Sequence, residues 1–324
     1  MNYISVIILS IIILSGLLLC FVIRDTFKKG FFLNKNKNTA YSIITILLLI
    51  FLCSFDTYFI EPNIIVKKQF DFPTANVQTP IKVAFIADIQ IGNHKKTDWT
   101  KKMVNEIIEI NPELVLLGGD LIDNEGTFED ESQYLEPLTA ISAKYPIYYI
   151  LGNHEYGIGG QTKGDKNKQT GDRSQLLITK MKDLNITLLR NNLSCPIIKN
   201  QQICLFGIDD IWSNKISFVE LNKWKNNIPL IFLTHNPDGI KLYPIDKNIP
   251  NITLAGHTHG GQIRLPFIGP LGNPGVTLPK KYFKGLNDYY GMKIFTTVGI
   301  GESGGPIRFW NPPEIAVINL KPQN

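Results

Sequence analysis

The strongest constraint on the fold is a series of short apolar runs, each ending in a polar side chain of a type that binds metal ions. Runs of this length, bounded by glycine or asparagine and separated by amphipathic segments, are typical of buried strands that alternate with helices. The pattern predicts an α/β fold with a mixed or parallel sheet covered by helices. Because ligands bind at the carboxyl ends of such strands, the polar side chains there should converge. They are Asp88, Asp120, Asp123, Asn153, His154, His235, His257 and His259.

One of these runs ends in two histidines, His257 and His259, that are separated by a single residue. Alternate residues of a strand face the same side, so both rings can point into one pocket. For any one such residue, an exposed turn or a histidine buried in the core is the alternative. The chain has only five histidines, and His154 and His235 also follow apolar runs, which favours a shared site. Imidazole, carboxylate and carboxamide ligands without a thiolate suit Mg, Mn, Fe or Zn.

Two longer apolar runs precede this region. The first, from Ile4 to Ile23, has twenty residues without a charge, enough to cross a hydrocarbon core as a helix. The second runs from Tyr41 to Ile60 and is interrupted only by Asp56. A secretory signal peptide is the alternative for the first run, although residues 1–3 include no basic side chain. We expect a membrane anchor of two transmembrane helices at residues 1–62, a connector at 63–80 and one soluble domain at 81–324.

Charge is concentrated between the two apolar runs. Residues 24–38 hold five basic side chains and one acidic side chain, a net +4 out of +5 for the whole chain. The positive-inside rule places this loop in the cytoplasm, so the soluble domain of a multi-pass protein of the cell membrane would be extracytoplasmic. Lys67 and Lys68, just after the second run, weaken this inference. The nearly neutral remainder argues against nucleic acid as a partner and favours a small-molecule or lipid substrate.

The four cysteines fall into two groups. Cys20 and Cys53 lie within the apolar runs, where they are expected to be inert packing residues. Cys195 and Cys204 flank a predicted hairpin with its turn at Lys199-Asn200. Two interpretations stay open for this pair: a cross-strand disulfide in an oxidising compartment, or two reduced and buried thiols.

Five short motifs follow one another in a fixed order between residues 82 and 320. They are Asp88-Ile89-Gln90, Gly119-Asp120-Leu121-Ile122-Asp123, Gly152-Asn153-His154-Glu155, the single His235, and Gly256-His257-Thr258-His259. With these motifs the chain resembles the calcineurin-like metallophosphoesterase superfamily. The run from Gly261 to Pro266, together with the apolar N-terminal runs, is similar to the bacterial membrane-anchored branch of that superfamily.

The resemblance implies a four-layer α/β/β/α sandwich that holds two divalent metal ions. Asp123 would support His154, which would act in catalysis by stabilising charge or protonating the leaving oxygen. The superfamily has a histidine where this chain has Gln90, whose neutral carbonyl oxygen favours Mn or Mg; His94 is an alternative ligand. The implied metal ligands are Asp88, Gln90 and His259 at the first site, Asn153, His235 and His257 at the second, and Asp120 bridging both.

The expected activity is that of a membrane-anchored, metal-dependent phosphoric ester hydrolase, which cleaves a phosphoester or pyrophosphate bond of a substrate that includes lipid-linked molecules. One alternative is a UDP-2,3-diacylglucosamine diphosphatase of lipid A synthesis, which needs a cytoplasmic site and so conflicts with the loop charge. The other is a catalytically silent relative that binds a phospholipid, an idea motivated by Gln90. The loops Gly157–Arg173, expected to be mobile, and Pro266–Gly291 would shape the substrate pocket.

Overall fold

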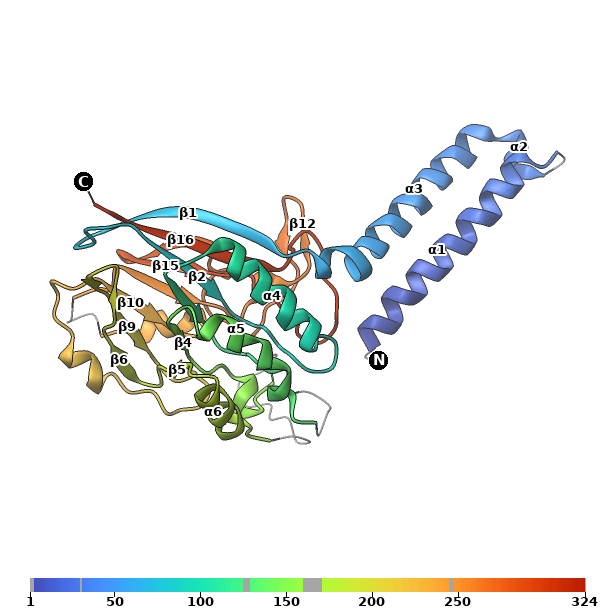
Figure 1. The fold of residues 1–324 in the computed structure, drawn as a ribbon. Helices are drawn as coiled ribbons and strands as arrows, with labels where there is room; N and C mark the ends of the chain where they lie inside the picture. Colours follow the sequence, from blue (N-terminus) through green and yellow to red (C-terminus); the bar gives the residue numbers. More distant parts are fainter. Residues whose placement is uncertain (1–2, 30, 125–128, 160–170, 245–247, 324) are drawn as a thin grey trace.

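The computed structural model describes residues 3–29, 31–124, 129–159, 171–244 and 248–323. A pair of long antiparallel helices projects from a domain built on two sheets (Figure 1). Both helices are long and apolar enough to cross a membrane, and they cover the two apolar runs of the sequence. The elements of this pair are α1 (Tyr3–Phe27), α2 (Phe32–Lys35), α3 (Lys37–Phe55), the π-helical turn η1 (Asp56–Ile60) and the 3₁₀ turn η2 (Glu61–Asn63).

The first sheet has six strands in the order β1-β16-β2-β3-β4-β5. Strands β2 to β5 are parallel, as expected for apolar strands linked by helices, and only the pairing of β16 with β2 is antiparallel. The strands are β1 (Val66–Thr74), β2 (Ile81–Ile86), β3 (Leu114–Leu117), β4 (Ile147–Tyr149), β5 (Thr187–Leu188) and β16 (Glu314–Pro322).

The segment expected to be a connector, residues 63–80, contains the edge strand β1. Its polar sequence hides the strand, but Phe72 packs into the core between the sheets, and Val66 to Thr74 pair with Glu314 to Pro322. The sheet therefore begins before residue 81. The division of the chain into anchor, connector and domain remains a prediction.

The second sheet is also mixed, in the order β14-β15-β11-β10-β9-β6. Its four central strands are parallel, and antiparallel strands close both edges. The edge strand β14 lies in the segment 266–291, which we expected to be a loop. The strands are β6 (Asn192–Ser194), β9 (Cys204–Gly207), β10 (Leu230–Leu233), β11 (Ile252–Ala255), β14 (Gly285–Tyr289) and β15 (Met292–Thr296).

Alternation along each strand divides the core into three layers of side chains. In β2, Ala84 and Ile86 face the helices, whereas Val83 and Phe85 face the second sheet. The helical layer on the first sheet consists of η3 (Glu131–Leu138), α4 (Thr97–Ile110), α5 (Thr139–Ser142) and α6 (Ser174–Asp183). The second sheet is covered by the 3₁₀ helices η5 (Val219–Lys223), η6 (Pro237–Leu242) and η8 (Lys280–Phe283).

These layers confirm the four-layer α/β/β/α sandwich, with one correction. The helix expected at residues 218–225 is the 3₁₀ helix η5, because five residues are too few to repay the cost of starting an α-helix.

Most of the segment 157–173, expected to be a surface loop, lies outside the described residues. The remaining short elements are η4 (His154–Tyr156), η7 (His259–Gly261), β7 (Ile197–Ile198), β8 (Gln201–Gln202), β12 (Arg264–Leu265) and β13 (Gly269–Pro270).

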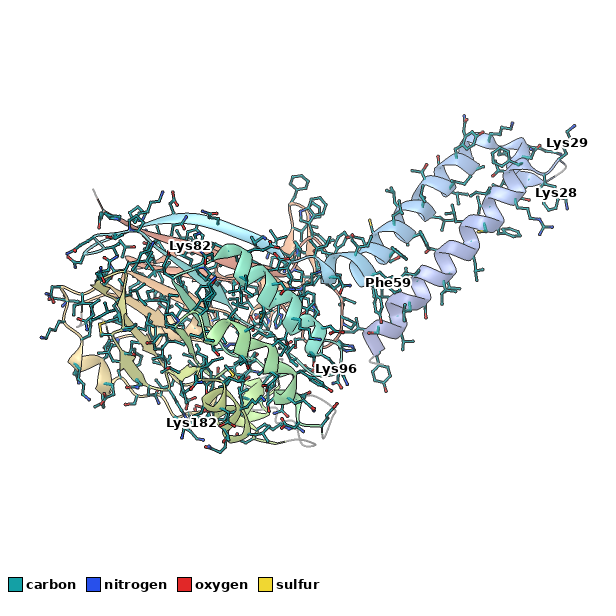
Figure 2. All side chains as sticks on the ribbon, in the orientation of Figure 1. Lys28, Lys29, Phe59, Lys82, Lys96 and Lys182 are labelled. Carbon is teal, nitrogen blue, oxygen red and sulfur yellow. A yellow bond between two sulfur atoms is a disulfide. The ribbon has the colours of Figure 1, made fainter. Side chains whose placement is uncertain are left out.

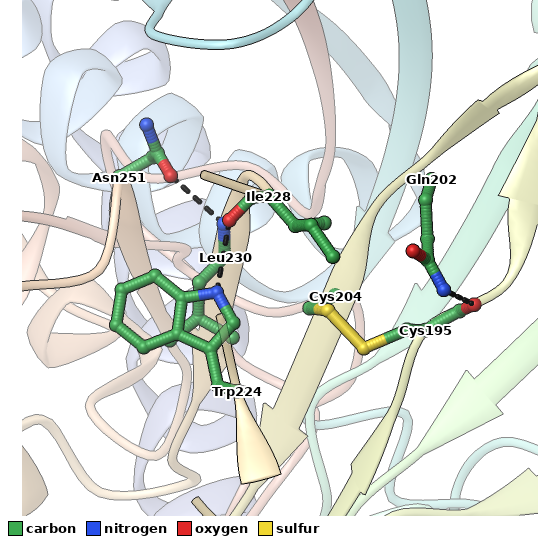
Figure 3. Close-up of a disulfide and its surroundings, with 7 residues drawn as sticks. All are labelled: Cys195, Gln202, Cys204, Trp224, Ile228, Leu230 and Asn251. Atoms are coloured by element: carbon green, nitrogen blue, oxygen red, sulfur yellow. Dashed lines mark hydrogen bonds between the residues drawn. A yellow bond between two sulfur atoms is a disulfide. The ribbon is translucent and has the colours of Figure 1, made fainter. Parts of the chain in front are cut away.

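Cys195 and Cys204 form a disulfide (Figure 3). Between them, β7 and β8 pair as an antiparallel hairpin around Lys199-Asn200, as the sequence predicts. Of the two interpretations left open for this pair, the structure has the disulfide. It joins the start of β9 to the segment before the hairpin, at the amino ends of the strands of the second sheet.

Buried charges join the helix pair to the domain. The carboxylate of Glu61 accepts hydrogen bonds from the backbone N–H groups of Trp310 and Asn311, and the Arg308 N–H donates to Thr57 O at 3.0 Å. The buried Arg308 guanidinium pairs with Glu302 and donates to the carbonyl oxygens of residues 298, 299, 301 and 311. The end of the helix pair and the loop after β15 are thus fixed together.

Replacing Arg308 by Met should destabilise the fold strongly, because Glu302 and four carbonyl groups lose a buried donor. We expect a loss of about 3 to 5 kcal/mol in the free energy of unfolding. Lys293→Met is the matched control, since its pair with Asp288 is about half exposed and is worth less than about 1 kcal/mol. Denaturant titration of the purified protein measures both; equal midpoints for the two variants would contradict this role of Arg308.

Candidate metal centre

The carboxyl ends of strands from both sheets meet at one place and deliver the predicted residues there. Asp88 follows β2, Asp120 follows β3, Asn153 follows β4, His235 follows β10, and His257 follows β11. Their side chains are almost completely buried, as are those of Gln90, His154 and His259, with residue exposures between 0% and 4%. The convergence expected from the strand pattern is therefore present.

Asp120 lies at the centre of the cluster. Its Oδ2 atom is 3.0 Å from His235 Nε2 and 3.9 Å from His154 Nε2. Asp120, His235 and His257 each offer one ligand atom, and these atoms lie within 4.8 Å of one another. Asp88 completes the group, with Oδ1 at 3.9 Å from His235 Nε2 and 3.8 Å from His259 Nε2.

Hydrogen bonds to backbone carbonyls orient the three imidazoles. His235 Nδ1 donates to Gly118 O at 2.8 Å, and His257 Nε2 donates to Pro274 O at 3.0 Å. His259 Nδ1 lies 3.3 Å from Gly301 O. In the neutral form of each ring the other nitrogen is an acceptor, which is the arrangement that metal-binding histidines use.

Two buried amide oxygens of the cluster lack a hydrogen-bond partner among the described residues. They are Gln90 Oε1 and Asn153 Oδ1. Leaving such atoms unsatisfied costs free energy, so buried polar groups of this kind indicate an unseen partner. Both are lone-pair donors, and together with two carboxylates they fit a divalent cation better than an anion.

The pKa shifts of the buried residues also indicate that this cluster would be stabilised by a positive charge. Burial raises the pKa of Asp88 to about 7, because its carboxylate is completely removed from water. Burial works to lower the pKa of His235, but the carboxylates of Asp120 and Asp88 outweigh it and raise that pKa to about 10. Burial lowers the pKa of His257 to about 3, which keeps this ring neutral, as a ligand must be.

His154 lines the same cavity as Asn153. The 3₁₀ turn η4 begins at His154, so strand alternation does not apply. His154 Nδ1 donates to the backbone carbonyl of Asp123 at 2.5 Å, so the contact with Asp123 is made by its main chain. On its other side, His154 Nε2 is 3.4 Å from the amide nitrogen of Gln90. Gln90 thus contacts His154 while its carbonyl oxygen stays unpaired.

Glu155 is a residue whose role the sequence did not reveal. Its buried carboxylate accepts hydrogen bonds from the backbone N–H groups of residues 120, 121, 122 and 152. It therefore holds together the two loops that carry Asp120 and Asn153. Residue 152 must be glycine for a steric reason, because a Cβ atom on Gly152 would lie 2.2 Å from Asp120 Oδ1. Trp212, also missed, packs edge-on against the His257 ring.

His94, the alternative ligand, is exposed and lines a separate cavity of about 620 Å³ together with Trp99 and Tyr134.

The cavity beside the cluster around Asp120 has a volume of about 370 Å³. Its polar lining residues include Asp120, Asn153, His154, His257 and His259. Its apolar lining residues include Ile263, Leu271, Ile307 and, from α1, Ile4. The cavity suits a ligand with a polar head and an apolar portion.

Comparisons with known proteins agree with this arrangement. The model of the calcineurin-like phosphoesterase family matches residues 81–261. The chain is 31% identical over 244 residues to "Phosphodiesterase YaeI" of Escherichia coli, covering 74% of this chain and 82% of that protein. It is 29% identical over 250 residues to "Uncharacterized metallophosphoesterase YkuE" of Bacillus subtilis, covering 75% and 80%. It is 27% identical to "Transmembrane protein with metallophosphoesterase domain" of Danio rerio, covering 74% and 53%.

Because the family model covers more than half of the chain and one relative exceeds 30% identity over most of its length, this chain belongs to the calcineurin-like phosphoesterase family.

Proposed function

We propose that the chain is a membrane-anchored phosphodiesterase that uses two divalent metal ions, with residues 1–62 as anchor and residues 81–324 as catalytic domain. The observation that carries the proposal is the buried cluster with two unsatisfied amide oxygens beside two carboxylates and three imidazoles. A purely structural cluster of this kind would carry the cost of its unpaired atoms without a benefit. The relative named a phosphodiesterase supports the diester as substrate class.

The residues divide between two sites. Asp88, Gln90 and His259 would hold the first ion, Asn153, His235 and His257 the second, and Asp120 would serve both. When bound, such an ion pair supplies Lewis acidity that activates a water molecule and neutralises charge on the phosphate oxygens. With Gln90 and Asn153 contributing neutral oxygen ligands, Mn or Mg is favoured.

His154 is the proposed general acid. Its Nδ1–H is committed to the Asp123 carbonyl, which leaves Nε2, facing the cavity, to carry a proton to the leaving oxygen. The amide N–H of Gln90 can donate to that nitrogen only in the neutral ring, so it orients His154 before Nε2 takes up the proton. In this proposal Gln90 has two roles, since its oxygen binds metal and its nitrogen orients the neutral ring.

Two features support an extracytoplasmic catalytic domain. Lys28 and Lys29 lie at the end of the helix pair that is remote from the domain (Figure 2), so the basic loop and the domain would be on opposite sides of a membrane. The Cys195–Cys204 disulfide is of a kind that persists in oxidising compartments. Both features argue against the cytoplasmic lipid A reaction as the activity of this chain.

A catalytically silent phospholipid-binding protein is the second candidate, favoured by the single departure at Gln90. Turnover of bis-p-nitrophenyl phosphate with Mn separates the two. The enzyme should hydrolyse it and lose that activity on Asp120→Asn, whereas a binding protein should show no difference between the two forms.

Replacing Asp120 by Asn should remove both metal ions, because the proposed shared ligand loses its charge. Gln90→His should keep or raise the occupancy of the first site, since imidazole replaces a neutral amide oxygen. Elemental analysis of the purified full-length variants gives the metal content. Two ions retained in the Asp120→Asn protein would refute the ligand assignment.

A reporter that is active only in the cytoplasm, fused after Leu320, should give no signal, because the positive loop keeps the domain on the opposite side. The same reporter inserted after Lys29, in the basic loop that should face the cytoplasm, is the positive control. Strong signal from the fusion after Leu320 would reverse the orientation and restore the lipid A reaction as the leading activity.

Replacing His154 by Ala should lower turnover by about 10²- to 10⁴-fold while both metal ions stay bound, as expected for loss of a positioned acid. The loss should be smaller for good leaving groups such as p-nitrophenolate, which need little protonation. Rates for a series of leaving groups, measured with the metal content, test this. A lost ion with equal damage across the series would show that His154 is a metal ligand.

A further inference from the structure

A short hairpin next to the end of α3 carries an apolar tip. Strands β12 and β13 pair as an antiparallel hairpin, and at its turn Phe267 is fully exposed and Ile268 is 68% exposed. Leu271, just beyond, is 55% exposed. No charged residue occurs in the sequence from 265 to 279. Single exposed apolar residues are ordinary, but neighbouring ones at a protruding tip mark a contact surface.

Backbone hydrogen bonds fix this hairpin beside the end of the membrane helix. Arg264 N–H donates to Phe309 O at 2.9 Å, and Ile263 forms a bridge with Phe309. The next residue, Trp310, is 64% exposed, and its N–H donates to the Glu61 carboxylate, directly after η1. Figure 1 shows the β12 hairpin projecting next to the end of α3. The apolar tip and Trp310 therefore lie near the level where α3 leaves the membrane.

The charges around the hairpin are basic. Arg264 begins β12, and the exposed Lys280 and Lys281 follow the apolar segment. Lys280 Nζ donates to Pro270 O in β13, so at least one ammonium group is held at the hairpin base. An apolar tip with cations behind it matches the layers of a bilayer surface, where phosphate groups lie outside the acyl chains. Tryptophan is also enriched at this boundary.

We propose that the β12–β13 tip, together with Trp310, inserts into the leaflet that holds the domain-side ends of α1 and α3. The partner is the lipid bilayer, because the surface continues directly from the helix end and its charges complement phosphate headgroups. The cavity at the metal centre shares Ile263 and Leu271 with this region and Ile4 with α1. Docking would open the cavity at the headgroup level, so that a phosphodiester lipid could enter without leaving the membrane.

Quenching by brominated acyl chains tests the insertion directly in the full-length protein reconstituted into phosphatidylcholine vesicles. Ile268→Trp is placed in a Trp310→Phe background. The matched control is Ile197→Trp in the same background, because Ile197 is 74% exposed and lies in the β7–β8 hairpin at the amino ends of the strands. We expect brominated lipid to cause a clear loss of emission for Ile268→Trp and none for Ile197→Trp, relative to the background protein.

Equal quenching of the two variants, or no quenching of Ile268→Trp, would overturn the proposal. The latter result would also be expected if the tip instead bound a protein, since the vesicles contain none.

A second measurement concerns substrate entry and rests on the proposed phosphodiesterase function. Ile268→Asp should lower hydrolysis of vesicle-embedded phosphatidyl-p-nitrophenol, with no change for soluble bis-p-nitrophenyl phosphate, and Ile197→Asp should affect neither. Equal loss on both substrates would overturn the docking role. If the unmodified protein hydrolyses neither substrate, the proposed function fails, while the quenching result still decides the docking.

Discussion

The carboxylates of Asp88 and Asp120 are buried close to one another between two sheets, and the surrounding structure follows from that charge. Asp210 and Glu155 are also buried nearby, and burial raises the pKa of both. Removing an ion from water costs several kcal/mol even after a protein relaxes around it. A chain that gathers carboxylates at one sheet edge therefore requires positive charge there. Divalent cations would supply this charge and would also satisfy the unpaired oxygens of Gln90 and Asn153.

The same constraint explains the hydrogen bonds behind the cluster. The Asp88 carboxylate accepts from His257 N–H, Asp120 Oδ1 accepts from His154 N–H, and Glu155 accepts from both loops. Gly301 N–H donates to Asp88 O, and Arg308 holds the Gly301 carbonyl while its own N–H donates to Thr57 O, just after α3. The position of the helix pair and the position of Asp88 are thus linked through one buried arginine.

Strand ends and their polar residues could be predicted from the sequence, because apolar periodicity and ligand type are local properties. The two long helices were predictable for the same reason. Strand β1 was not, because its polar sequence becomes a strand only by pairing with β16, almost at the other end of the chain. The roles of Glu155 and Arg308 were also hidden, since each depends on backbone groups from several loops that only the folded chain brings together. Which ligand holds which ion remains a prediction.

The central claim is that Asp120 joins two metal ions in one buried cluster. Electron paramagnetic resonance of the full-length protein loaded with Mn²⁺ tests it most directly, because two Mn²⁺ ions that share a carboxylate are magnetically coupled. The account predicts the spectrum of a coupled pair. A spectrum of isolated Mn²⁺ at full loading, or no bound Mn²⁺ at all, would contradict it.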